Sequence, residues 1–329
     1  MNYNLGASTY LLVATLMVGG CKMSDSTENK QPAESTSKAA QALPNWRAMW
    51  NFGDPAGTEE KFREALNEGI AAQDQEYIWV VTTQLARTLG MQRKFADADA
   101  ILDGIRGDLD KASIEVNLRY LLERGRVLNS SGKAEESIPV FEAAWNMGQG
   151  KEQDPLTADA GHMLGIAAKG EAAIEWAHRT MGFCEASPDE RCKGWLGPLY
   201  NNTGWTLHDQ SNFEGALELW EKSLTFNQTK GDTNTIFISR WTIARCYRSM
   251  GRMDEALAEQ LSLHKDRATA GDPGMGYIEE ELGELYLALN NPKEARPWFS
   301  KAYEMLGKDE WLKAEEPERL ERLKKLGSE

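Results

Sequence analysis

Two short stretches of the sequence, forty residues apart, place polar and aromatic side chains at the same spacing. The first set is Asn201, Trp205 and His208, and the second is Trp241, Arg245 and Arg248. Spacings of four and then three residues put each set along one face of a helix. Two adjacent stripes of this kind would suit a carboxylate, because arginine binds it through paired hydrogen bonds while tryptophan excludes water.

His208 and the adjacent Asp209 are the residues here that could carry acid–base chemistry. The sequence around them specifies no nucleophile and no second base. Of the four histidines none lies in an HExxH motif, and the chain has no CxxC, no GxSxG and no Walker-type phosphate loop. The sequence therefore predicts no catalytic residue, no metal site and no cofactor. An enzyme or enzyme subunit that uses a groove near His208 stays an alternative.

Small residues recur every 39 or 40 positions and define the elements that must position these side chains. These anchors are Ala86, Gly125, Gly165, Gly204, Ala244 and Gly283. Twelve residues after each anchor stands Ala or Ser, and sixteen residues after five of the six stands a large apolar residue. Small residues let two antiparallel helices approach, and large ones fill the space beside them. The pattern predicts an all-α chain of helix pairs, in which the apolar "YIWVV" and "TIFIS" are helical.

The stretches "YNNTGWTLHDQSNFEGALELWEKS" from Tyr200 and "LGELYLALNNPKEARPWFSKAY" from Leu282 resemble the tetratricopeptide repeat. That resemblance implies a right-handed superhelical solenoid of antiparallel helix pairs. We expect six repeats over 77–308, a cap helix in 45–76 and a C-terminal capping helix in 309–329. The period exceeds the 34 residues usual in the family, so helices or turns must be longer.

In this family the first helix of each repeat lines a concave groove that holds peptides or proteins. The resemblance places the residues three before, one after and four after each anchor in that groove. The predicted partner-binding residues are Asn201, Trp205, His208, Trp241, Arg245 and Arg248. Gly204 and Trp220 are assigned to packing instead. The expected partner is a protein or peptide, acidic or with a free carboxylate.

The N-terminal segment predicts export. Tyr10–Gly20 (YLLVATLMVGG) is apolar but too short to span a membrane, and small residues end it, as in a secretory signal. The "VGGC" that ends at Cys21 resembles the lipobox of bacterial lipoproteins, whose cysteine carries lipid. This resemblance implies a signal peptide over 1–21, and the polar residues 22–44 predict a disordered tether. The alternative is an apolar N-terminus with an unmodified thiol.

Two further cysteines, Cys184 and Cys192, flank a Ser-Pro-Asp turn, and we expect them to form a disulfide in an oxidising periplasm. The formal net charge of −14 argues against binding nucleic acid. The sequence thus favours a non-enzymatic scaffold, lipid-anchored in the bacterial envelope and facing the periplasm, on the outer membrane rather than the inner. A cytosolic regulator that binds a signalling peptide is the other alternative.

Overall fold

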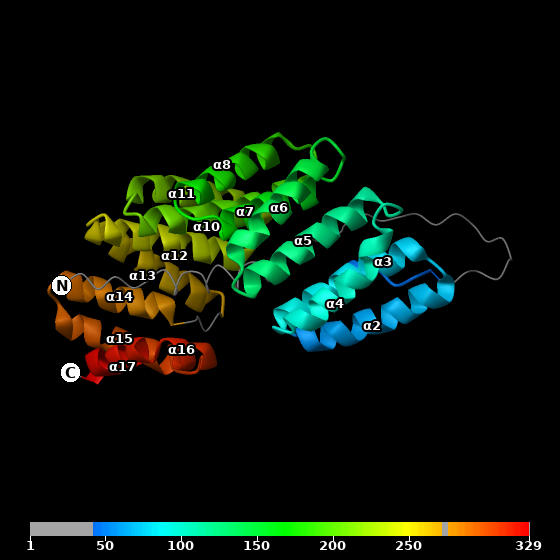
Figure 1. The fold of residues 1–329 in the computed structure, drawn as a ribbon. Coiled ribbons are helices and arrows are strands. Elements are labelled where there is room, and N and C mark those ends of the chain that lie inside the picture. Colours follow the sequence, from blue (N-terminus) through cyan, green and yellow to red (C-terminus); the bar gives the residue numbers. More distant parts are fainter. Residues whose placement is uncertain (1–41, 272–275, 329) are drawn as a thin grey trace, which may run out of the picture. The chain divides into compact units, whose positions relative to one another are not determined.

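The computed structural model describes residues 42–271 and 276–328 (Figure 1). The predicted signal peptide, Cys21 and all of the predicted tether except residues 42–44 lie outside the described residues. The chain forms two compact units, one ending at Leu199 and the other beginning at Tyr200. We call them unit 1 and unit 2 and describe each by itself.

Unit 1 consists of helices joined by short turns. Its elements are η1 (Trp46–Met49), α2 (Pro55–Ala72), α3 (Gln75–Met91), α4 (Phe95–Ile105), η2 (Arg106–Asp108), α5 (Ile114–Ser130), α6 (Ala134–Gly148), α7 (Asp154–Ala167), α8 (Glu171–Ala186) and α9 (Glu190–Lys193). The pairs α3/α4, α5/α6 and α7/α8 run antiparallel (Figure 1). We call α3, α5 and α7 the first helices of unit 1.

Unit 2 continues the same pattern. Its elements are α10 (Leu196–Asp209, which begins at the end of unit 1), α11 (Phe213–Lys230), α12 (Thr233–Ser249), α13 (Met253–Thr269), α14 (Tyr277–Ala288), α15 (Pro292–Leu306), α16 (Glu310–Glu315) and α17 (Pro317–Ser328). Its first helices are α10, α12 and α14. No strand occurs among the described residues, so the all-α prediction of antiparallel helix pairs is confirmed, including helix over "YIWVV" and "TIFIS".

The turn inside each helix pair has one repeated geometry. A residue with positive φ stands seven positions after the anchor in five of the six pairs: Arg93, Gly132, Ser211, Gly251 and Asn290. The next residue donates its N–H to the carbonyl of the residue three after the anchor, as Asn212 does to Leu207 at 2.9 Å. This is a Schellman cap, which satisfies the last carbonyls of the first helix. The spacing therefore repeats because the first helix ends the same way each time.

The third pair departs from this geometry. Its positive-φ residue is Gly170, five positions after Gly165, and Ala168 is already extended. The first helix, α7, is therefore shorter than α5 and ends at Ala167. The short helix α9 and a turn follow α8 before α10 begins, and they restore the 39-residue interval to the next anchor.

The anchors are small because the side chain sixteen residues later lies directly on them. A Cβ atom built on Gly125 would lie 2.3 Å from the Phe141 ring, and one built on Gly204 would lie 2.5 Å from the Trp220 indole. Gly283 is closed in the same way by Phe299. Ala86 and Ala244 stand where the residue sixteen positions later is not aromatic. Three of the four glycine anchors therefore face an aromatic ring, and Gly165 is the exception, with Met181 sixteen positions later.

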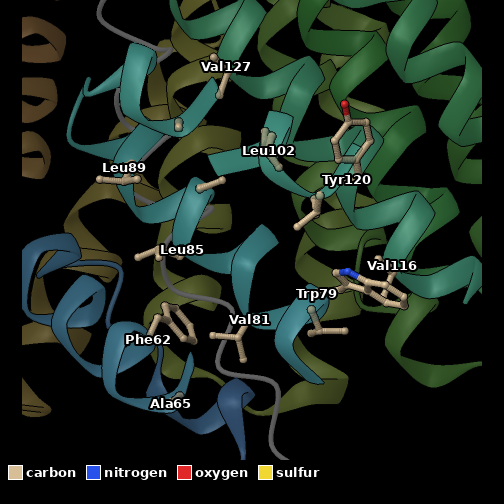
Figure 2. Close-up of a cluster of buried hydrophobic side chains, with 14 residues drawn as sticks. Phe62, Ala65, Trp79, Val81, Leu85, Leu89, Leu102, Val116, Tyr120 and Val127 are labelled. Atoms are coloured by element: carbon tan, nitrogen blue, oxygen red, sulfur yellow. The ribbon is translucent and has the colours of Figure 1, made fainter. Parts of the chain in front are cut away.

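Buried side chains between the helices form the core of each unit. Figure 2 shows the cluster in unit 1 where Phe62, Leu85 and Leu102 are completely enclosed. In unit 2, Leu320 and Leu323 of α17 join the cluster built on Phe299 and Leu306 of α15. The apolar face of α17 thus covers the apolar side of the α14/α15 pair. None of the described helices is long and apolar enough to cross a membrane.

Candidate functional site

The predicted partner-binding residues of unit 2 do come together, but half of them are buried. Asn201, Trp205 and Arg245 are 7%, 4% and 7% exposed, and the other three are half-buried. The main-chain carbonyl of Asn201 accepts a hydrogen bond from Trp220 Nε1 at 3.2 Å, and its side-chain amide donates to Asn202 Oδ1. Asn201 therefore helps to hold the first helix, α10, against the second helix, α11.

Trp205 lies in an aromatic cluster rather than apart from the core. Its ring centroid is 4.8 Å from that of Trp220, 5.5 Å from His208 and 6.0 Å from Trp241. The prediction that separated Trp205 from the packing residues was wrong, because an indole is wide enough to reach the second helix from the edge of the first. Truncation to alanine would cost about 3–5 kcal/mol in packing. A Trp205→Ala variant therefore cannot report on binding alone.

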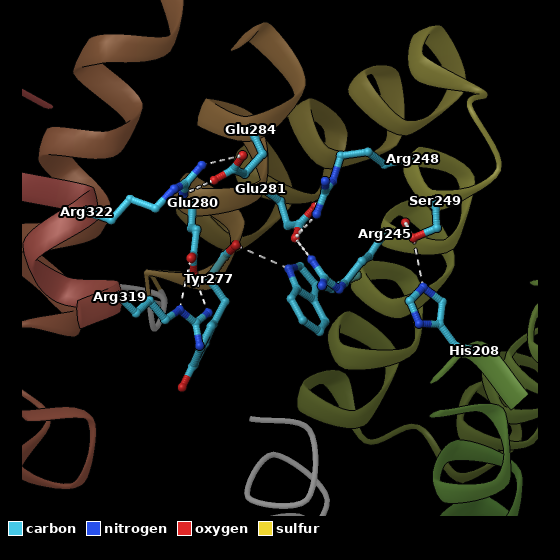
Figure 3. A network of polar contacts seen from close by, with 11 residues as sticks. His208, Arg245, Arg248, Ser249, Tyr277, Glu280, Glu281, Glu284, Arg319 and Arg322 are labelled. Carbon is cyan, nitrogen blue, oxygen red and sulfur yellow. Dashed lines mark hydrogen bonds and ion pairs between the residues drawn. The ribbon is translucent and has the colours of Figure 1, made fainter. Parts of the chain in front are cut away.

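Arg245 and Arg248 on α12 reach Glu281 on α14 (Figure 3), and Trp241 connects the same two helices. Trp241 Nε1 donates to the Tyr277 carbonyl at 3.3 Å. Arg245 forms a buried ion pair with Glu281, and Arg248 donates to both oxygens of the same carboxylate at 2.7 and 3.1 Å. Burial alone would raise the pKa of Glu281, but the two guanidinium groups hold it at about 2. The arginines predicted to bind a ligand carboxylate already bind one from the chain itself.

Sequence reasoning missed Glu281, although a signal for it was present. Glu281 stands two positions before its anchor, Gly283, and Glu123 has the same place before Gly125. An arginine follows the preceding anchor by one position in both cases, as Arg245 and Arg87. Acid and arginine on successive first helices could have been recognised as a pair from these offsets.

The neighbouring carboxylates of α14 bind α17. Arg319 contacts Glu280 with two nitrogens, one of them at 2.9 Å, and Arg322 does the same with Glu284, with one nitrogen at 3.1 Å (Figure 3). Arg319 also donates to Glu316 at 3.0 Å. Arginine–carboxylate pairs thus join α12 to α14 and α14 to α17. We call the surface of α10, α12 and α14 that carries these residues the first-helix face of unit 2.

His208 has a hydroxyl within hydrogen-bond reach, which the sequence did not indicate. Its Nε2 lies 2.8 Å from Ser249 Oγ, and its Nδ1 lies 4.0 Å from Asp209 Oδ1. The order Ser–His–Asp is that of a hydrolase triad, but 4.0 Å is too long for the carboxylate hydrogen bond that orients the imidazole. The Ser249 hydroxyl also lies 3.3 Å from the Arg245 carbonyl of its own helix. Packing accounts for this histidine, whose ring contacts Trp205, Phe213 and Trp220.

Unit 1 carries a second set of charged residues in equivalent positions. Arg126 Nη1 donates to Glu123 Oε1 at 2.6 Å, and its Nη2 lies 2.5 Å from both oxygens of Asp159. Arg87 lies 3.7 Å from Glu123. Burial opposes the charge on Arg126, yet Asp159 and Glu123 outweigh it and raise the pKa of Arg126. This is the first-helix face of unit 1, formed by α3, α5 and α7.

Cys184 and Cys192 are both buried thiols in this structure, with their sulfur atoms 3.5 Å apart. A disulfide requires about 2.05 Å, so they are adjacent without being bonded. The pairing expected from the sequence stays a prediction. Between the two cysteines, Asp189 caps α9 and accepts a hydrogen bond from the Arg191 N–H. Among the described residues, no group of three or more metal-ligating side chains is placed to hold an ion.

Two family models match the chain, and both describe the tetratricopeptide repeat. They cover residues 199–229 and 280–305. These are the α10/α11 pair and most of the α14/α15 pair. No curated protein matches the chain as a sequence relative.

Several solved structures share the fold at low sequence identity. The apo form of RapI superposes with a TM-score of 0.66 at 14% identity, covering 80% of this chain and 75% of that one. The apo form of the quorum sensor NprR from B. thuringiensis gives 0.56 at 14% identity, with coverage of 84% and 78%. A signal transduction ATPase from Pyrococcus horikoshii with a tetratricopeptide-repeat sensor gives 0.63 at 11% identity. This chain spans 44% of that protein's length and is 85% covered.

Proposed function

We propose that the chain is a non-enzymatic scaffold that binds a peptide or protein along its first-helix faces, because two of its segments match models of the tetratricopeptide repeat. The observation that carries the proposal is that arginine and carboxylate side chains from successive first helices pair on a common face in each unit, and that in unit 2 Trp205 and Trp241 lie beside them. Arginine and tryptophan are the residue types that dominate binding energy at protein interfaces.

The similarity to NprR adds a precedent. NprR is described as a quorum sensor, and it has also been crystallised with its cognate peptide NprX. The apo form of NprR is the one that shares the fold of this chain, with a TM-score of 0.56. We therefore transfer the kind of ligand, a peptide, and not the position of NprX.

A partner with carboxylate groups is the first ligand to test in unit 2. The side chain of Arg248 is 22% exposed, whereas Glu281 is 3% exposed. An incoming carboxylate would reach Arg248 from solvent and share it with Glu281. Binding would then depend on the ligand replacing part of an existing ion pair, which makes the net gain smaller than for an uncompensated arginine.

Selection from a library of random peptides with free C-termini tests the proposal. Enriched peptides should share a motif and lose about tenfold or more in affinity for Arg248→Gln, since a charged hydrogen bond contributes about 1.5–3 kcal/mol. Arg296→Gln, on the exposed surface of α15, is the matched control and should bind normally. Absence of enrichment, or equal losses in both variants, would overturn the proposal for unit 2.

For the location of the protein we propose a lipid anchor at Cys21, which holds the chain at the bacterial envelope, facing the periplasm. The proposal rests on the "VGGC" sequence and the polar stretch that follows it. Metabolic labelling with palmitate should mark the wild-type chain and leave Cys21→Ser unlabelled, and globomycin should block processing. An unlabelled, soluble cytosolic protein would refute the anchor and favour the regulator of a signalling peptide.

An enzyme remains a second candidate because Ser249 lies beside His208. If the pair were catalytic, a fluorophosphonate probe would label Ser249, and His208→Gln would abolish that labelling. We expect no labelling, because the distance from His208 Nδ1 to Asp209 Oδ1 is too long for a hydrogen bond. The Ser249 hydroxyl also contacts the Arg245 carbonyl within α12. Stoichiometric labelling would replace the scaffold proposal with a hydrolase.

A further inference from the structure

The first-helix face of unit 1 holds a chain of charges that extends over three helices. It runs from Arg87 on α3 through Glu123 and Arg126 on α5 to Asp159 on α7. Two further arginines of α5 have carboxylates of their own: Arg119 pairs with Glu115 at 2.8 Å, and Arg124 pairs with Asp99 at 2.6 Å. The four residues of the chain therefore carry two positive and two negative charges and balance one another.

His162, which follows Asp159 by three residues on α7, adds no charge at neutral pH. Its side chain is 4% exposed, and burial lowers its pKa to about 4, although Asp159 favours the protonated form. The whole set is therefore electrically neutral. A ligand group with a full charge would remain uncompensated here, so the complementary group is polar but uncharged.

Two buried atoms of this face have no hydrogen-bond partner among the described residues: Glu123 Oε2 and His162 Nε2. Both side chains are more than nine-tenths buried, at 2% and 4% exposure. A buried acceptor left without a donor costs about 1–3 kcal/mol, and more when it is charged. An N–H donor placed beside Glu123 Oε2 would relieve that cost.

Arg87 is the accessible member of the set. Its side chain is 25% exposed, and its distance of 3.7 Å from Glu123 Oε1 exceeds a hydrogen bond. Its guanidinium lies over the rings of Trp50 and Phe52, at 5.6 and 5.7 Å from their centroids. Glu123 Oε1 is already held by Arg126 at 2.6 Å. Arg87 can therefore turn toward a ligand without breaking a short hydrogen bond to Glu123.

We propose that Arg87 and Glu123 together hold one uncharged amide group of a bound peptide. The Arg87 guanidinium donates to the amide oxygen, and Glu123 Oε2 accepts the amide N–H. This proposal rests on the proposed peptide-binding function and gives unit 1 a ligand class different from the carboxylate tested in unit 2. Flat apolar surfaces lie beside these polar groups. Trp50 and Phe52 lie beside Arg87, and the Trp195 ring is 5.2 Å from the His162 ring.

Such an amide comes from the main chain of a peptide or from an Asn or Gln side chain. Small probes separate these sources in the full-length protein. N-methylacetamide represents the main chain, propionamide the side chain, and acetate and guanidinium the charged alternatives. We would follow the Arg87 side-chain Nε–Hε resonance and the His162 ring resonances by NMR, at equal ionic strength throughout.

We expect saturable shifts of the Arg87 resonance with one or both amides and none with guanidinium. Main-chain recognition favours N-methylacetamide, and side-chain recognition favours propionamide. A larger saturable response to acetate would overturn the proposal, and so would amide shifts that stay linear with concentration, since those indicate solvent effects only.

Variants give an independent readout. Arg87→Gln and Glu123→Gln should each weaken amide binding about tenfold or more, whereas Arg106→Gln, on η2 outside this face, should not. Circular dichroism shows whether each variant folds. If Arg87→Gln does not fold, Arg87→Lys takes its place; this variant keeps the positive charge and should retain part of the amide binding. Unchanged affinity in folded Arg87→Gln would also overturn the proposal. Selection of peptides that depend on Arg248 of unit 2 could still succeed in that event. Failure of the amide site in unit 1 is therefore distinguishable from failure of the proposed peptide-binding function.

Discussion

At the scale of single residues, the glycine anchors follow from the size of the side chain packed on them. Gly204 faces Trp220, which is fully buried and fixed by a hydrogen bond to the Asn201 carbonyl. Gly165 has no such partner, and an added Cβ there would lie 3.6 Å from its nearest neighbour. Two glycines with the same place in the repeat therefore differ in what they tolerate.

We predict that Gly204→Ala lowers the free energy of unfolding by about 1–3 kcal/mol, because Trp220 cannot move to accommodate the methyl group. Gly165→Ala should raise it by about 0.5–1 kcal/mol, since alanine favours helix and fits the space. Urea denaturation followed by circular dichroism measures both. Equal effects of the two substitutions would show that the opposing side chain does not set the anchor.

Gln260 is the exception to the rule of a large apolar residue sixteen positions after the anchor. It is completely buried, and neither atom of its amide has a hydrogen-bond partner among the described residues. Gln84 is also buried, but its amide accepts from Trp50 Nε1 and donates to Thr83 Oγ1, both at 3.1 Å. The same residue type is thus unsatisfied in one place and satisfied in the other.

Replacement of Gln260 by methionine, which has a similar shape, should raise the free energy of unfolding by about 1 kcal/mol, because it removes an unpaired buried amide. Gln84→Met should lower it by a similar amount, since it leaves the Trp50 indole N–H without its acceptor. Thermal melting of the two variants provides the comparison. A destabilised Gln260→Met would indicate that the amide has a partner after all.

At the scale of helices, the turn after each first helix is more regular than its sequence. The positive-φ position holds Arg, Gly, Ser, Gly and Asn in five different pairs. Non-glycine residues pay about 1 kcal/mol for this conformation, so the cap hydrogen bonds and the helix packing must offset it. The turns could be located from the sequence, whereas their common geometry could not be inferred from such different residues.

Cys184 on α8 lies next to Cys192 on α9, so a disulfide between them would join these two helices. We predict that mild oxidation removes two alkylatable thiols and raises the free energy of unfolding by about 2–3 kcal/mol, from the loop closed in the unfolded chain. Mass spectrometry after alkylation counts the thiols, and thermal melting measures stability.

Cys246 is the control for this experiment. Burial raises the pKa of its thiol to about 11, and its sulfur contacts the Phe213 carbonyl instead of another cysteine. Cys246→Ser should leave the oxidation unchanged, whereas Cys184→Ser should abolish it. Two reactive thiols in protein isolated from an oxidising compartment would contradict the pairing.

At the scale of the whole molecule, acid should weaken the protein in two steps. The pKa of His162 lies below its ordinary value of 6.5, at about 4, so the unfolded chain binds a proton before the folded one does. The contribution of neutral His162 to the free energy of unfolding is fully present above pH 6.5 and decreases as the pH falls toward 4. The loss is on the order of 3 kcal/mol, at about 1.4 kcal/mol per unit of pKa. Asp159 and Arg126 are the charged groups that face His162.

We predict that His162→Gln has a flatter dependence of melting temperature on pH between 6.5 and 4.5 than the wild-type protein. His178→Gln, at an exposed position on α8, should follow the wild type. The second step belongs to carboxylates such as Glu281, whose pKa of about 2 gives stability that is present above pH 4.5 and lost below it. Identical pH profiles for wild type and His162→Gln would exclude a role for the buried imidazole.

The sequence by itself determined the helix pairs, their anchors and their turns. These features depend on spacings of three, four and about forty residues, which recur along the chain and leave a regular trace. The first-helix location of Asn201, Trp205 and His208 followed from the same spacing. Their role in binding stays a prediction, as does that of Trp241, Arg245 and Arg248.

Only the tertiary structure decided what those side chains contact. Arg245 and Arg248 meet Glu281 from a helix more than thirty residues away, and Trp205 packs on Trp220. The atoms left unpaired at Glu123 and Gln260 also became visible only there. The physical reason is that periodicity records which side of a helix a residue occupies. Which partner it meets depends on the distance and rotation between packed helices, and on the length of each side chain.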